Sequence, residues 1–210
     1  TTITNGSILH STTVSNTGTV TVEGVADFGD LDNTGTVNVA ASGALNLSNT
    51  DLLAGTVNNA GQVTQTGAME IVGDFNVTGS GKGTFGDVTL TGDFTAQDGT
   101  ENTFNTITVS EGAIVQNAGT MTVAGATTIN GSYQGASTSK GTFGDTTVTG
   151  TFDAQVGSVN SFGSLTISDN GKFTNAGELT ASGDLVVDSV LDNTGKVTVA
   201  GNATVTGTYT

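Results

Sequence analysis

Short runs in which every second residue is aliphatic recur along the whole chain. Examples are TVTV at 19–22, TVNV at 36–39, VTLT at 88–91 and ITVS at 107–110. A period of two is typical of β-strands, because successive side chains point to opposite faces. Glycine follows many of these runs, and a second short apolar position comes next, so the pattern predicts strand, turn, strand. The residues expected to point inward and stack include Val20, Val22, Val37, Val39, Met121, Val123, Val197 and Val199.

The chain also repeats itself over a longer distance. GTFGDVTLTGDFTAQDG, at 83–99, returns as GTFGDTTVTGTFDAQVG at 141–157, so the offset is 141 − 83 = 58, and the same offset aligns 59–75 with 117–133. Inside this period a shorter motif, Asn-x-Gly-x followed by an aliphatic position, recurs and marks the individual coils. Asn16 and Asn33 are 33 − 16 = 17 positions apart, and Asn175 and Asn193 are 193 − 175 = 18 apart, so three coils make one 58-residue unit. The motif begins at Asn16, Asn33, Asn59, Asn117, Asn175 and Asn193.

Periods of this size indicate a solenoid. No 3.6-residue pattern supports helical repeats, and a propeller blade would need about 40 or more residues. We predict an all-β fold, a parallel β-solenoid (β-helix) of about 11 coils of 17–20 residues, forming a single domain over 1–210. Its 58-residue repeats are expected at 59–116 and 117–174, with a partial repeat plus an extra coil at 175–210 and a divergent repeat at 1–58. A hydrophobic content of only 34% suits this fold, since each coil needs to cover only its neighbours.

The Asn-x-Gly motif is expected to form the corners between faces. Glycine supplies positive φ, and asparagine hydrogen-bonds the nearby backbone. Stacked asparagines would form an amide ladder down the inside of one corner. We therefore interpret these asparagines as structural and not as ligand contacts.

The composition narrows the choice of partners. There are 19 acidic residues against 4 basic ones, a formal charge of −15, so we expect no nucleic-acid partner and no insertion into a membrane. The chain has no cysteine and no proline, and 32 glycines. It therefore has no disulfide framework and no thiolate metal site.

The NTGTVTV and NAGTMTVAG coils, rich in Thr, Asn and Gly, resemble the right-handed parallel β-helices of bacterial autotransporter passengers and filamentous-haemagglutinin-type adhesins. The resemblance covers essentially the whole chain and is compositional and periodic. It implies a non-enzymatic, rod-like segment of a secreted or cell-surface adhesin or stalk, with its signal peptide already removed and a surface glycan or protein as ligand.

Candidate chemistry is sparse, and we expect no catalytic, cofactor or metal residues. His10 is the single histidine, and a lone histidine is more often structural than catalytic. The densest acidic cluster is Asp27, Asp30 and Asp32, but its FGD motif recurs at Phe85 and Phe143, which favours turn residues. Calcium at the acidic turns and a polysaccharide-active β-helix enzyme remain minor alternatives.

Two further alternatives come from the outer residues and the ends. Outward threonine pairs could form an ice-binding face, although Gln62, Glu178 and Lys196 would roughen it. Neither end carries a recognisable cap, which suggests a piece of a longer rod or a subunit joining end to end into an extracellular filament or sheath. The threonine pairs are Thr19 and Thr21, Thr89 and Thr91, Thr120 and Thr122, and Thr147 and Thr149.

Overall fold

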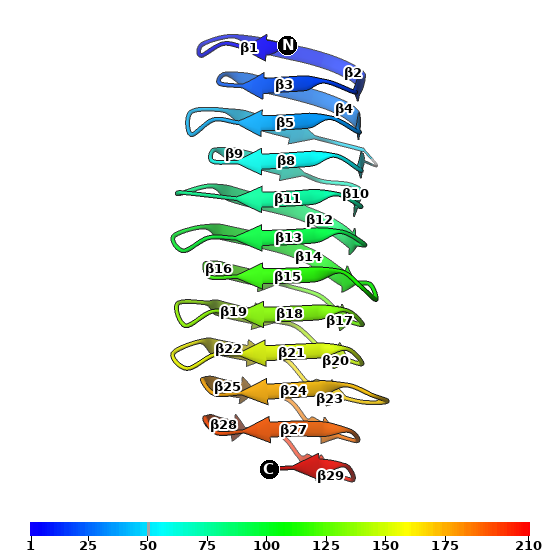
Figure 1. The fold of residues 1–210 in the computed structure, drawn as a ribbon, viewed down its shortest axis with the longest axis vertical. Helices are drawn as coiled ribbons and strands as arrows, with labels where there is room; N and C mark the ends of the chain where they lie inside the picture. The colour runs from blue at the N-terminus through cyan, green and yellow to red at the C-terminus, as the bar shows by residue number, and fades with distance from the viewer. Residues whose placement is uncertain (50) are drawn as a thin grey trace.

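The computed structural model describes residues 1–49 and 51–210, and it confirms a parallel β-solenoid of about 11 turns. Thirty strands and no helix occur in these residues. Every strand pair is parallel, with each strand bonded to those one coil above and below. In Figure 1 the front strands run to the left and the chain returns behind them to the right as it descends, so the coil is right-handed.

Three faces run the length of the rod. Face 1 is a 12-stranded sheet, and faces 2 and 3 are the two halves of an 18-stranded sheet. The strands of face 1 are β1 (Thr2–Ile3), β3 (Thr19–Val22), β5 (Thr36–Val39), β8 (Thr56–Asn59), β11 (Asp74–Val77), β13 (Asp93–Ala96), β15 (Ile114–Asn117), β18 (Ser132–Gly135), β21 (Thr151–Ala154), β24 (Lys172–Asn175), β27 (Val190–Asn193) and β30 (Thr208–Tyr209).

The other two faces share four long strands. The strands that run through both faces are β2 (Ile8–Asn16), β4 (Val25–Asn33), β12 (Lys82–Leu90) and β14 (Glu101–Val109). Face 2 alone holds β6 (Ala44–Leu47), β9 (Gln62–Gln65), β16 (Thr120–Val123), β19 (Lys140–Phe143), β22 (Val159–Phe162), β25 (Glu178–Ala181) and β28 (Lys196–Val199). Face 3 alone holds β7 (Asp51–Leu53), β10 (Ala68–Ile71), β17 (Thr127–Ile129), β20 (Thr146–Val148), β23 (Leu165–Ile167), β26 (Leu185–Val187) and β29 (Ala203–Val205).

Coil length depends on the corners. On face 1 Thr19 pairs with Thr36, a step of 36 − 19 = 17, whereas Asp93 pairs with Ile114, a step of 114 − 93 = 21. The longer coil includes a turn at 110–113, in which Ala113 donates to the Ser110 carbonyl and Gly112 has φ +85°. The three-coil unit is confirmed, because Phe75, Phe94, Val115 and Tyr133 are successive partners and 133 − 75 = 58.

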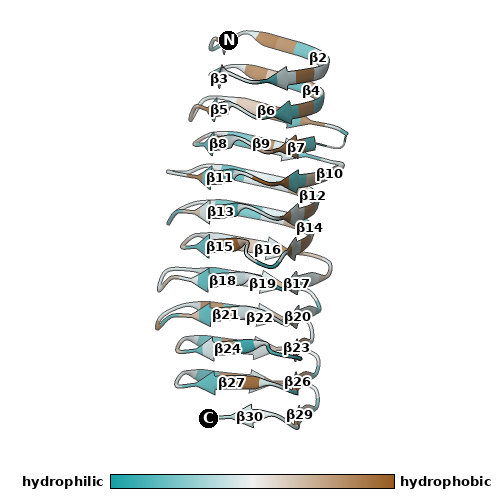
Figure 2. Ribbon diagram, turned by 45° about the vertical axis from the view of Figure 1, so that its right-hand side comes forward, coloured by the Kyte–Doolittle hydropathy of each residue, from teal (hydrophilic) through white to brown (hydrophobic). Residues whose placement is uncertain are grey.

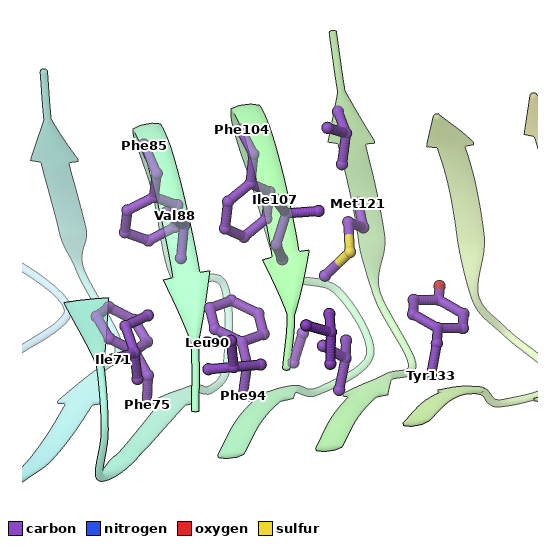
Figure 3. Packing of buried hydrophobic residues seen from close by; sticks show 14 of the residues in the cluster. Ile71, Phe75, Phe85, Val88, Leu90, Phe94, Phe104, Ile107, Met121 and Tyr133 are labelled. Atoms are coloured by element: carbon purple, nitrogen blue, oxygen red, sulfur yellow. The ribbon is translucent and has the colours of Figure 1, made fainter. Parts of the chain in front are cut away.

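The core is a narrow column filled from all three faces. The inward positions predicted at 20, 22, 37, 39, 121 and 123 are confirmed as buried, and Val197 and Val199 pack against the core while partly exposed. Phe75 and Phe94 stack on face 1 with ring centroids 5.5 Å apart, and Phe85 and Phe104 stack on face 2 at 4.9 Å (Figure 3).

Hydrophobic and hydrophilic residues are mixed along the strands of successive coils (Figure 2). This follows from the period-two pattern, which sends one residue inward and the next to solvent. No helix in residues 1–49 and 51–210 is long and apolar enough to cross a membrane.

Candidate functional site

The six motif asparagines lie at two corners, so the predicted ladder down one corner is wrong. Asn16 and Asn33 end face 3, where the chain turns to face 1. The other four, Asn59, Asn117, Asn175 and Asn193, end strands of face 1, where the chain turns to face 2. The motif was ambiguous because both corners need the same short turn.

The asparagines do serve the turns. The side-chain Oδ1 of Asn117 accepts from the Gly119 N–H at 3.1 Å, and Asn59 makes the same bond to Gly61 at 3.0 Å. Among the six, amide-to-amide contacts occur only in pairs. Asn16 donates to Asn33 at 2.7 Å, and Asn175 donates to Asn193 at 2.8 Å. Five of the six are buried, and only Asn193 is partly exposed, so their role is structural.

The recurring FGD sequence also has a structural role. Phe85 is buried, and a Cβ on Gly86 would lie 2.2 Å from the carbonyl oxygen of Gly67 on the preceding coil. Asp87 points outward, where its Oδ1 accepts from Asn105 at 2.7 Å and Thr106 at 2.8 Å. The glycine therefore permits the bend between faces 2 and 3, and the aspartate ties this bend to the next coil.

One groove on the surface contains the single histidine. It encloses about 580 Å³ along face 2 and the corner between faces 2 and 3, near the first coils. His10 Nδ1 lies 2.9 Å from Asp27 Oδ2, and Asn46 donates to Asp27 Oδ1 at 2.6 Å. His10, Asp27 and Asn46 are register partners on β2, β4 and β6, which explains why the fold brings them together.

This arrangement does not form a nucleophile–base pair. Ser11 follows His10 on the same strand, so the two side chains point to opposite faces. Ser11 Oγ donates instead to the Thr13 carbonyl at 2.9 Å. Both acceptor oxygens of Asp27 are already occupied, and His10 is 71% exposed. The groove thus offers one imidazole edge and several hydroxyls.

The acidic cluster is spread along one strand. Asp27 faces outward on the face 2 half of β4, whereas Asp30 and Asp32 pair with Thr13 and Ser15 on the face 3 half. Within the described chain no group of three His, Asp or Glu residues is arranged to hold a metal ion.

One buried carboxyl group escaped sequence reasoning. Asp51, on β7, is 1% exposed, and its Oδ1 accepts from the Leu31 N–H at 2.7 Å. Burial, with a smaller contribution from the nearby Asp30 charge, raises the pKa of Asp51 from 3.8 to about 6. A period-two reading of LSNTDLLAG, at 47–55, was the available signal, since it places the aspartate in phase with inward Leu53.

The threonine pairs do not share a plane. Thr19 and Thr21 lie on face 1, Thr120 and Thr122 on face 2, and Thr89 on face 3. Face 2 carries a single file of threonines, interrupted by Ser161, beside a row that includes Lys82, Glu101 and Lys140. This geometry does not support an ice-binding face.

Comparison with known proteins found no family model, no curated protein and no solved structure that matches the chain.

Proposed function

We propose that the chain is a non-enzymatic structural rod, a segment of a secreted or cell-surface adhesin or stalk. The observation that carries this proposal is the uninterrupted register. From β1 to β30, each described strand of face 1 is hydrogen-bonded to the equivalent strand of the next coil. Every coil therefore adds about 4.8 Å of length, and 11 steps give a rod of about 50 Å.

The division of residues between inside and outside supports the same role. Inward positions hold aliphatic and aromatic side chains, and buried polar ones serve corners or fill the core. Outward positions hold Thr, Asn, Gln and acidic residues, which suits a solvated exterior at a net charge of −15. Each further coil of sequence thus lengthens the rod without changing its cross-section.

Removal of one repeat tests whether length is modular. Deleting residues 117–174 joins Gln116 to Asn175 and recreates the local sequence QNAG at the corner. We expect a folded protein whose rod is about 14 Å shorter by small-angle X-ray scattering, because three coils are removed. The matched control is deletion of 117–171, which removes three residues fewer than one repeat. This odd shift turns the side chains that follow to the opposite face of the sheet, so the control should not fold. Unfolding of both proteins would contradict the modular rod.

The surface location needs its own experiment. Protease added to intact producing cells should cleave the chain if it is displayed, whereas protection in intact cells and cleavage after lysis would contradict the proposal. Electron microscopy of the purified protein distinguishes the alternative filament subunit, for which we would expect fibres instead of separate rods.

A further inference from the structure

Four of the six glutamines in the chain surround one shallow groove on face 1. The groove encloses about 300 Å³ and spans the coils of β13, β15, β18 and β21, which lie one below another in Figure 1. We call it the glutamine groove. Its lining residues are Thr95, Ala96, Gln97, Gln116, Asn117, Ala118, Gln134, Ala136 and Gln155.

The register explains how the groove is built. Gln116 and Gln134 are direct partners on β15 and β18, so their side chains project side by side. Ala118 and Ala136 follow the ends of the same two strands and leave a low floor of methyl groups. Gln97 and Gln155 occupy the equivalent position on the coils before and after. They therefore close the two ends of this floor.

The backbone holds these positions rigidly. The Ala118 N–H donates to the Ala96 carbonyl at 2.8 Å, Ala136 donates to Asn117 at 2.9 Å, and Gln155 donates to Gly135 at 3.0 Å. Beneath the groove, Asn117 is anchored by Gly119 and by the Tyr133 hydroxyl. A ligand would therefore meet a preformed backbone and alanine floor, which lowers the entropic cost of that part of the contact.

The glutamine groove carries no charge of its own. All nine lining residues are uncharged, although the chain carries a net charge of −15. The four glutamine side chains are exposed and form no side-chain hydrogen bond within residues 1–49 and 51–210. Each amide both donates and accepts, and the alanine methyls between them offer a small apolar floor.

We propose that the glutamine groove binds a short neutral oligosaccharide. A sugar presents hydroxyls that donate and accept, and a C–H face that can lie on the alanines. Anionic ligands are disfavoured because Asp98 follows Gln97 and Asp153 is the register partner of Gln134. A flat sheet from a second copy would not enter a concavity closed by Gln97 and Gln155. This site goes beyond the structural role, since a rod does not require it.

Titration of the intact protein with cello-, malto- and fully N-acetylated chito-oligosaccharides, followed by calorimetry and by NMR of the side-chain amides, tests the proposal. We expect saturable binding of at least one series, with shifts at Gln116 and Gln134, and no binding of oligogalacturonate. The Gln116→Glu/Gln134→Glu variant keeps side-chain size but adds charge, and should weaken binding at least tenfold. Ala136→Met, which fills the floor, should do the same.

Gln62→Glu is the matched control, because it makes the same change at an exposed position of face 2. It should bind like the parent protein. The proposal is overturned if none of the three neutral series binds, or if binding survives both groove variants. Neither result bears on rod length, so a failed groove is distinguishable from a failed structural role.

Discussion

The first coils and the later coils fill the same interior with different side chains. On face 1 the inner column holds Val20, Val37 and Val57 in the early coils. From β11 onward the same column holds Phe75 and Phe94, and after Val115 it continues with Tyr133, Phe152 and Phe173. The same backbone arrangement therefore accommodates a column of valines in the early coils and a column that is mostly aromatic in the later ones.

The compensation comes from the neighbouring column of face 2. Beside the valines this column holds Ala26, Leu45 and Val63, whereas on the coils of Phe75 and Tyr133 it holds Gly83 and Gly141. The Phe143 ring folds over the space that Gly141 leaves, and a Cβ there would lie 2.4 Å from its Cε2 atom. The GTFGD repeat thus pairs a glycine with a ring two residues later, so on these two coils a missing side chain on face 2 accompanies an added ring on face 1.

The largest expected effect comes from removing a ring from the later coils. Phe152 is fully buried and stacks on Tyr133 and Phe173, with ring centroids 4.3 Å away on each side. Phe152→Ala should lower the free energy of unfolding by about 3–5 kcal/mol, because it leaves a cavity between two rings. Val57→Ala, in the early coils, should cost about 2 kcal/mol. Urea unfolding followed by circular dichroism measures both, and equal losses would contradict the distinction between the two regions.

The early coils contain the one buried carboxyl group among the described residues. Its titration makes the stability of these coils depend on pH in a way that the later coils do not share. Asp51 has its pKa raised from 3.8 to about 6 on folding, so the folded state binds the proton more tightly. This stability is present below about pH 4 and is lost as pH rises through about 6, a difference of about 2–3 kcal/mol. Asp51→Asn should therefore stabilise the protein at about pH 7 and have little effect at about pH 4.

Asp32→Asn is the control for Asp51→Asn, since it removes the same charge from an exposed position of the neighbouring coil. General relief of the acidic surface would stabilise both variants alike. If the Asp32 variant gains as much at neutral pH as the Asp51 variant, the buried carboxyl group is not the cause.

Adding a methyl group where the later coils have none tests the compensation directly. Gly141→Ala would place its Cβ 2.6 Å from Asn160 Oδ1 as well as against Phe143. We expect a loss of about 1–3 kcal/mol from overpacking. Gly18→Ala, in the early coils, meets nothing within 4 Å and should change stability by less than about 0.5 kcal/mol. Thermal unfolding that shifts equally in both variants would contradict the paired volumes.

The fold was predictable because its signals are periodic. Alternation in TVTV and TVNV predicted the inward valines, and the 58-residue offset predicted the three-coil unit. The sequence did not predict which corner each Asn-x-Gly motif occupies, because the same short turn is used at two different corners. The glutamine groove was hidden for a similar reason: Gln97, Gln116, Gln134 and Gln155 are each one coil apart in the sequence and meet only once the register is known.

The smallest expected effect on stability concerns how three equivalent buried asparagines satisfy their side-chain N–H groups. The equivalent asparagines of successive repeats each place a side-chain N–H in the interior, and Asn59 donates it to the Lys82 carbonyl at 2.9 Å, whereas Asn175 donates to Asn193. Of these three, only Asn117 uses a ring hydroxyl, that of Tyr133, at 2.9 Å.

Tyr133→Phe should therefore cost about 1 kcal/mol, because the buried Asn117 amide loses this acceptor. The substitution converts the residue into the one that the preceding repeat has at Phe75, so shape and stacking are preserved. Phe75→Tyr is the reciprocal variant and should not stabilise, since Asn59 is already satisfied by the backbone. Urea unfolding of the two variants measures the difference. An unchanged midpoint for Tyr133→Phe would show that the ring stabilises this coil and that its hydroxyl does not.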